Sequence, residues 1–173
     1  MKGLWIGGYG EEDINGNIGF YTLARMSQNP GDDITLVDWG HLDTNDFDNV
    51  DYVVVYSYGC AAFWRMIFTL TKTGIKIPAL KMLIILCGVP RFWWGQFYGL
   101  LWNVPSFVQS AICYNINSIP YSVPIRNVTT KYSNVNLDGR GLDHVTIQYD
   151  PFTQNLILSE LDNLRNNLTV PNS

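Results

Sequence analysis

Apolar residues in this chain gather in short blocks, and stretches with helical spacing lie between several of these blocks. Five blocks are predicted strands, at residues 3–7, 34–39, 51–56, 82–87 and 110–116. The blocks are largely continuous and do not alternate with polar residues. Continuous blocks predict strands that are covered on both faces, as in a parallel sheet.

Helical spacing marks three further segments. Residues 19–27 form the first, which Pro30 and the glycine after it would end, and residues 61–70 form a second that is almost wholly apolar. Residues 145–149 are expected to be a last short extended piece. Pro151 can then begin a final amphipathic helix. The inner face of that helix is marked by Leu156, Ile157, Leu161 and Leu164.

The predicted strands are separated by helices or long crossings and not by hairpin turns. This order favours a mostly parallel sheet with right-handed crossovers. We therefore expect an α/β protein, a single-domain three-layer α/β/α sandwich with a roughly five-stranded central sheet. The 173 residues suffice for one core and are too few for two ordinary domains, so residues 1–173 are expected to form one domain.

Charged residues are sparse, and 15 acidic and 11 basic side chains give a net charge of −4. No cluster of lysine or arginine could neutralise a run of phosphates, which argues against nucleic acid as a partner. The three cysteines, Cys60, Cys87 and Cys113, have a spacing typical of buried free thiols and not of disulfides or metal ligands. We see no signal peptide and no transmembrane segment, so we expect a cytoplasmic protein.

Ser57 is the candidate nucleophile. Ligands of parallel sheets bind outside the carboxyl ends of the strands, and the segment VVVYSYGCA (residues 53–61) places Ser57 there, between a strand and an apolar helix. At such a turn the hydroxyl is exposed at the helix N-terminus, where backbone N–H groups and the helix dipole favour a forming oxyanion. The alternative is a serine that only caps the helix.

His144 is the candidate general base that such a serine requires. It lies in the segment GLDHVTI (residues 141–147), just before the final helix. The other histidine, His41, follows the second predicted strand, and we interpret it as structural.

Together these features resemble the α/β-hydrolase family. The family motif G-x-S-x-G is matched by Ser57 and Gly59, with Val55 in place of the first glycine. The letters DHVTI around His144 look like the histidine loop of lipases and esterases. The resemblance implies a small serine esterase of about cutinase size, without an inserted cap domain.

The resemblance also implies where the oxyanion would be held. One donor would be the backbone N–H of Tyr58, directly after the serine. The second would come from the glycine loop after the first strand, from Tyr9 with Gly8 beside it. A phosphate-binding loop is the alternative for this segment, but the loop lacks the G-x-G-x-x-G spacing and three acidic residues follow it.

The acid of a catalytic triad is the least defined member. In the resembling family it follows the strand before the histidine loop, a stretch that holds no carboxylate in this chain. We expect Asp138 to orient the imidazole, with Asp143 as the other carboxylate between the serine and the histidine. Asp138 could instead only close a turn before glycine. If neither acid reaches, an amide or hydroxyl such as Asn117 or Ser122 would hold the ring of a Ser–His dyad.

Residues 91–102 concentrate aromatic side chains after the fourth predicted strand. These residues could line an acyl pocket or form a lid over it, or they could form an apolar helix that packs on the sheet. If residues 92–102 are exposed, they could also contact a partner or a lipid. The candidate pocket or lid residues are Phe92, Trp93, Trp94, Phe97 and Trp102.

The expected function is hydrolysis of a hydrophobic carboxylic ester, small-molecule or lipid-like, through an acyl-enzyme. We expect no cofactor and no metal, because the serine supplies the covalent step. Two alternatives stay open. One is a catalytically degenerate scaffold that acts as a binding protein, and the other is a thioesterase or amidase that uses the same residues.

Overall fold

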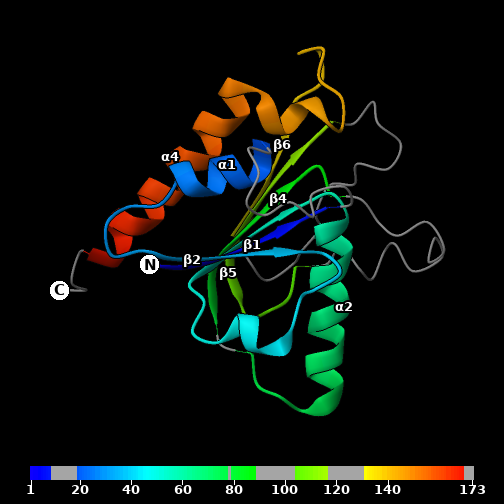
Figure 1. Ribbon diagram of the computed structural model, residues 1–173, viewed down its shortest axis with the longest axis vertical. Coiled ribbons are helices and arrows are strands. Elements are labelled where there is room, and N and C mark those ends of the chain that lie inside the picture. Colours follow the sequence, from blue (N-terminus) through cyan, green and yellow to red (C-terminus); the bar gives the residue numbers. More distant parts are fainter. Residues whose placement is uncertain (9–18, 78, 89–103, 117–130, 170–173) are drawn as a thin grey trace.

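The computed structural model describes residues 1–8, 19–77, 79–88, 104–116 and 131–169. Its centre is a six-stranded sheet in the order β2-β1-β3-β4-β5-β6, and every neighbouring pair is parallel (Figure 1). The strands are β1 (Lys2–Gly7), β2 (Asp33–Asp38), β3 (Tyr52–Tyr56), β4 (Leu80–Leu86), β5 (Val108–Asn115) and β6 (Lys131–Asn136).

Helices cover both faces of the sheet. On one face lie α2 (Tyr58–Thr73) and the short 3-10 helix η1 (Thr44–Phe47), and on the other lie α1 (Gly19–Met26) and α4 (Pro151–Thr169) (Figure 1). The predicted α/β/α sandwich with a parallel sheet is therefore confirmed.

The structure differs from the sequence prediction in two elements. The sheet has a sixth strand, β6, whose sequence KYSNVN is polar and whose residues are mostly exposed. An edge strand of this kind carries no block of apolar residues. Residues 145–149 are not extended, because the 3-10 helix η3 (Thr146–Tyr149) forms there. The carboxylate of Asp143 accepts the backbone N–H groups of Val145 and Thr146, and this Asx-type turn leads into η3.

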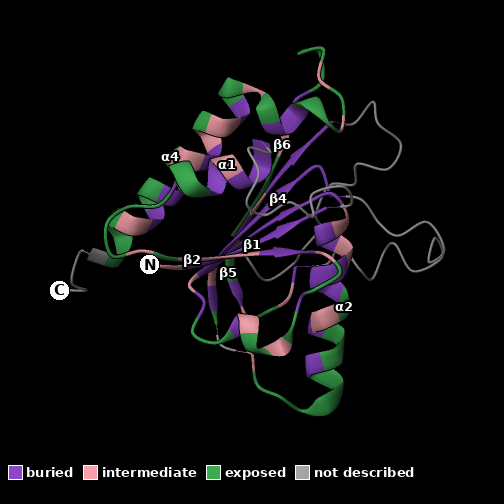
Figure 2. Cartoon of the chain, viewed as in Figure 1, coloured by how far each residue is buried: buried purple, intermediate pink, exposed green. Residues whose placement is uncertain are grey.

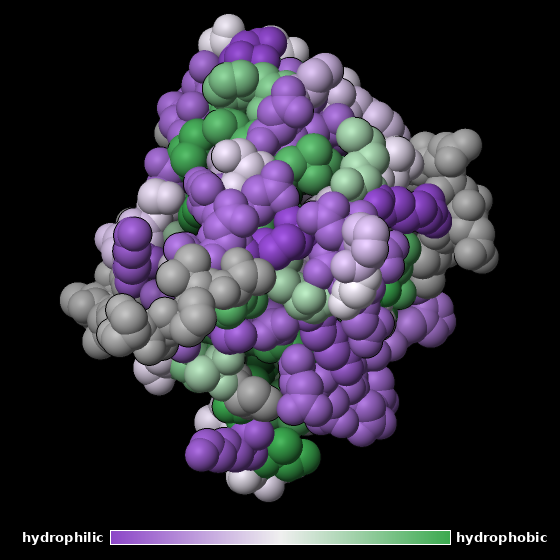
Figure 3. All heavy atoms as spheres, turned by 90° about the vertical axis from the view of Figure 1, so that its left-hand side faces the viewer, coloured by the Kyte–Doolittle hydropathy of each residue, from purple (hydrophilic) through white to green (hydrophobic). Residues whose placement is uncertain are grey.

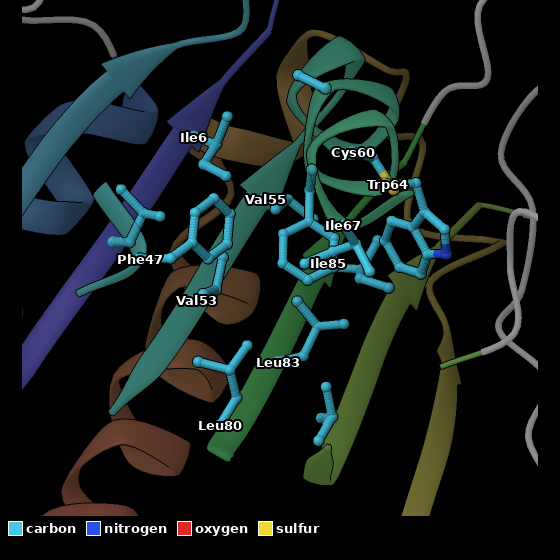
Figure 4. Packing of buried hydrophobic residues seen from close by; sticks show 14 of the residues in the cluster. Ile6, Phe47, Val53, Val55, Cys60, Trp64, Ile67, Leu80, Leu83 and Ile85 are labelled. Atoms are coloured by element: carbon cyan, nitrogen blue, oxygen red, sulfur yellow. The ribbon is translucent and has the colours of Figure 1, made fainter. Parts of the chain in front are cut away.

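Two apolar clusters hold the layers together, one on each face of the sheet. The central strands are almost wholly buried between the helices (Figure 2). Strands β1, β3 and β4 contribute to both clusters, because their alternate side chains point to opposite faces. On the α2 face, Val53 and Val55 of β3 pack with Ile67 of α2 (Figure 4). On the α4 face, Val54 and Tyr56 pack with Ile157 of α4.

The carboxyl ends of β1 and β3 form the topological switch point of the sheet. The chain runs from β1 outward to β2 and then returns to β3 on the other side of β1. Connections therefore leave these two strand ends on opposite faces, and a crevice at such a point is where open α/β sheets bind ligands. Ser57 follows β3, and Gly8 follows β1.

The surface on the side of α1 and α4 is mostly hydrophilic, with apolar residues scattered across it (Figure 3). None of the helices in the described ranges combines the length and apolarity that crossing a membrane requires.

Asp32 joins α4 to the turn between α1 and β2. Its carboxylate accepts hydrogen bonds from Arg165 of α4 and from the Met1 amino group, each at 2.7 Å. Burial opposes ionisation of this carboxyl, but the hydrogen bonds prevail and lower its pKa from 3.8 to about 2. The ionised form therefore stabilises the fold.

We predict that Asp32→Asn lowers the free energy of unfolding by about 2 kcal/mol at neutral pH. The folded-state pKa lies below the unfolded one, so the contribution is fully present above pH 3.8 and is lost as the pH falls toward 2. Urea unfolding at neutral and at acid pH checks this, with Asp33→Asn at the exposed neighbouring position as the control. An equal loss at both pH values would contradict the assignment.

Candidate active site

Ser57 occupies a strained turn between β3 and α2. Its backbone has φ 55° and ψ −126°, a conformation that residues with a side chain rarely adopt. Its N–H donates to the Leu86 carbonyl at 3.3 Å, and its carbonyl accepts from the Cys60 N–H at 3.2 Å. Strain of this kind costs on the order of 1–3 kcal/mol and persists where the surrounding structure fixes it, often at functional sites.

Two glycines make this turn sterically possible. A Cβ on Gly8 would lie 2.4 Å from Ser57 Cβ and 2.7 Å from Ser57 Oγ, so the Gly8 backbone lies directly against the serine side chain. A Cβ on Gly59 would lie 2.2 Å from the Ile6 carbonyl oxygen, so the first turn of α2 packs on the backbone of β1. Val55, which replaces a motif glycine, packs in the core beneath α2 and so does not obstruct the turn (Figure 4).

His144 reaches Ser57 from the loop between β6 and η3. The Ser57 Oγ and His144 Nε2 atoms lie 2.7 Å apart, although 87 positions separate the two residues in the chain. Asp143 shapes this loop through the hydrogen bonds that start η3, and its own side chain is exposed. The fold therefore brings together the two residues that the sequence analysis selected as nucleophile and base.

Tyr56 fixes the position of the imidazole. Its ring is stacked on the His144 ring, with centroids 5.4 Å apart and planes inclined by 18°, and its hydroxyl donates to the His144 carbonyl at 2.6 Å. The Gln148 side chain donates to the same hydroxyl at 3.3 Å and accepts the Phe20 N–H at 3.0 Å. Sequence analysis missed Tyr56, although strand alternation places its side chain on the face opposite to Val55.

Cys87 lies on the other side of the imidazole. Its sulfur is 3.1 Å from His144 Nδ1, and the residue is fully buried at the carboxyl end of β4. Its backbone has φ 44°, and its N–H donates to the Tyr114 carbonyl at 2.8 Å. Sequence analysis identified a buried free thiol here but no role in the site.

The contact between Asp138 and His144 stays a prediction. Asp143 is exposed, and its carboxylate accepts the N–H groups of Val145 and Thr146. Asp138 is exposed in the turn after β6, where its N–H donates to Asn136 Oδ1 at 3.0 Å. The next residue, Gly139, has φ 83°, so the segment forms a tight turn that leads away from β6.

The chain matches no family model, no curated protein and no solved structure. What the site can do chemically must therefore be inferred from its own atoms.

The other predicted site residues are only partly described. Tyr58 begins α2, and its ring lies 6.1 Å from that of Trp39. His41 is exposed and pairs with the buried carboxylate of Asp38, three residues earlier. The residues outside the described ranges are Tyr9, Phe92, Trp93, Trp94, Phe97, Trp102, Asn117 and Ser122.

Burial lowers the pKa of His144 below its ordinary value of 6.5, because the charged imidazolium loses hydration. The charge of Asp143 opposes this shift but does not cancel it. The imidazole is therefore neutral at pH 7 and able to accept a proton.

Within the described ranges no group of His, Cys, Asp or Glu side chains is arranged to hold a metal ion.

We predict that NMR titration of the imidazole protons gives His144 a pKa below 6.5. The chain has two histidines, so the spectrum of His41→Gln assigns the signals. Asp143→Asn should lower the pKa of His144 further, because it removes the charge that favours the imidazolium. A measured pKa at or above 6.5 in the unaltered protein would rule out the burial argument.

Proposed function

We propose that this chain is a serine hydrolase of the α/β-hydrolase type, which cleaves a hydrophobic carboxylic ester through an acyl-enzyme. The observation that carries the proposal is the 2.7 Å approach of Ser57 Oγ to His144 Nε2, made at a turn where the serine backbone is strained. An N-cap serine needs neither feature. The side chain of Ser57 also makes no capping hydrogen bond to α2.

The proposed reaction begins with the neutral imidazole. His144 Nε2 accepts the Ser57 hydroxyl proton while Oγ attacks the ester carbonyl carbon, and a tetrahedral intermediate forms. The imidazolium then returns that proton to the leaving alcohol as the ester C–O bond breaks. A water molecule repeats the sequence on the acyl-enzyme and releases the acid. The lowered pKa of His144 keeps the imidazole in the form that this cycle starts from.

The oxyanion of the intermediate would form at the N-terminus of α2. The backbone N–H of Tyr58 lies in the first turn of this 16-residue helix, where the helix dipole favours negative charge. Gly8 lies against the serine side chain and brings the β1 loop to the same place. Removing one such donor lowers kcat on the order of 10²–10³-fold.

Aromatic side chains near the serine turn favour an apolar substrate. The rings of Trp39 and Tyr58 lie next to the serine turn, and the chain is 14% aromatic and 15% charged, which favours an apolar acyl or alkyl group over a charged one. A thioesterase or an amidase would share the acylation step. Comparing turnover of an ester, a thioester and an amide with the same acyl group separates the three activities.

A binding scaffold without catalysis is the second candidate. It is favoured by one observation: in the part of the chain that the structure describes, the imidazole has a thiol and not a carboxylate at Nδ1. Such a protein would keep the fold and would not react with reagents that need an activated serine.

We predict that a fluorophosphonate probe labels the protein and that Ser57→Ala abolishes labelling. Oγ would displace fluoride from phosphorus, a step that requires the serine to be activated. His144→Ala should slow labelling by about 10²-fold or more, because it removes the general base. Ser27→Ala is the matched control, since Ser27 is also buried and hydrogen-bonded. A folded protein that stays unlabelled would favour the binding scaffold.

We predict that Gly8→Ala suppresses labelling in a protein that still folds. The added methyl group would occupy the space of the Ser57 side chain, so the hydroxyl must leave its position beside the imidazole. Thermal unfolding measures the stability of the variant, and the rate of labelling measures the site. Labelling at the unaltered rate would show that the serine does not need this geometry.

A further inference from the structure

The Ser57–His144 contact determines which hydrogen-bond role the other ring nitrogen, Nδ1, must take. A neutral imidazole carries one N–H, and if Nε2 accepts the serine proton, that N–H is on Nδ1 and must donate. In serine hydrolases a carboxylate accepts it, which keeps the imidazole in this tautomer and orientation. Here the Cys87 sulfur lies 3.1 Å from Nδ1.

The sequence leaves few carboxylates that could take this place. Between Ser57 and His144 the chain contains two, Asp138 and Asp143. Asp143 is exposed and accepts the N–H groups that begin η3, and Asp138 is exposed in the turn after β6. The charge of Asp143 raises the pKa of His144, but burial lowers it by more.

We propose that Cys87 is the positioning residue of the site, whose thiol sulfur accepts the Nδ1–H of His144 in the place that a carboxylate takes in a triad. This inference rests on the proposed serine hydrolase function. It adds a neutral third member to the Ser57–His144 pair.

The surroundings of Cys87 fix its sulfur. The residue follows the buried end of β4 with a positive φ, and its N–H is bound to the Tyr114 carbonyl of β5. A Cβ on the next residue, Gly88, would lie 2.7 Å from the Cys60 sulfur, so the backbone here is closely packed against α2. Sulfur is a weak acceptor, but the Cys87 sulfur is already in place and need not move to accept the Nδ1–H.

Cys87 is a poor candidate for the nucleophile itself. It is fully buried, and it directly follows the end of β4. Ser57 has both the strained turn and the helix N-terminus that stabilise an attacking oxygen and an oxyanion. The two residues therefore hold opposite sides of one imidazole and have different roles.

A thiol in this place has two consequences that a carboxylate would not have. It carries no charge to stabilise the imidazolium, so the base keeps the low pKa that burial gives it, and the acid limb of the rate profile should lie below pH 6.5. A thiol can also donate its own hydrogen to Nδ1, which selects the other tautomer and turns Nε2 into a donor. A carboxylate at position 87 would exclude that tautomer and raise the base pKa.

The test compares Cys87→Ser, Cys87→Ala and Cys87→Asp in the full chain by the rate of fluorophosphonate labelling across pH. Cys87→Ala should label about tenfold more slowly, because Nδ1 loses its acceptor. Cys87→Ser should stay within about threefold of the unaltered rate, since a hydroxyl also accepts. Cys87→Asp should move the acid limb upward by about one pH unit or more. Cys113→Ala, at another fully buried cysteine, should label at the unaltered rate.

A second readout does not depend on activity. The ¹⁵N chemical shifts of the His144 ring report which nitrogen carries the hydrogen. We expect Nδ1–H in the unaltered protein and a mixture of tautomers in Cys87→Ala.

Three results would overturn the inference. These are equal rates for Cys87→Ser and Cys87→Ala, an unmoved pH limb in a folded Cys87→Asp, or ring shifts that do not change in Cys87→Ala. If Cys87→Asp does not fold, the serine and alanine variants decide. Failure of the proposed function is a different result, an unaltered protein that the probe does not label, and the ring shifts then still test the position of Cys87.

Discussion

The backbone conformation of Ser57 is the constraint on which the site depends. A residue with a side chain at φ 55° is stable only if its neighbours prevent relaxation, and here they are a central strand and the first turn of a long helix. Strand β3 pairs with β1 and β4 on its two sides. Helix α2 can pack closely on β1 because Gly59 has no side chain. Burial of the apolar blocks thus supplies the free energy that holds the strained turn.

One strand end positions both members of the proposed Ser57–His144 pair. Ser57 is presented at the carboxyl end of β3, and Tyr56, the last residue of the strand, stacks on the imidazole and binds its loop. Two adjacent residues therefore contact the imidazole, Ser57 through its hydroxyl and Tyr56 through its ring. Gln148 extends this arrangement to α1, because it connects the Tyr56 hydroxyl with the Phe20 N–H.

The fold was largely predictable because five of the six strands are blocks of apolar residues that only a doubly covered sheet can bury. Strand β6 was not, since an exposed edge strand needs no apolar block. The selection of Ser57 and His144 followed from their places in the order of elements, and the structure brings them into contact. The role of Cys87 had no local signal, because a buried cysteine after a strand has the same sequence pattern whether or not an imidazole faces it.

The electrostatic character of the site follows from what surrounds the imidazole. His144 is in contact with the Tyr56 ring, the Cys87 thiol and the Ser57 hydroxyl. None of these three groups is a carboxylate. Burial disfavours the imidazolium, and the charge of the exposed Asp143 favours it without cancelling the effect of burial. A base in these surroundings is available at lower pH than an ordinary histidine, but it is also weaker, so proton transfer from the serine is less favourable. In the proposed reaction, more of the rate would therefore come from orientation and from the proposed oxyanion donors at α2, which lie beside the strained turn.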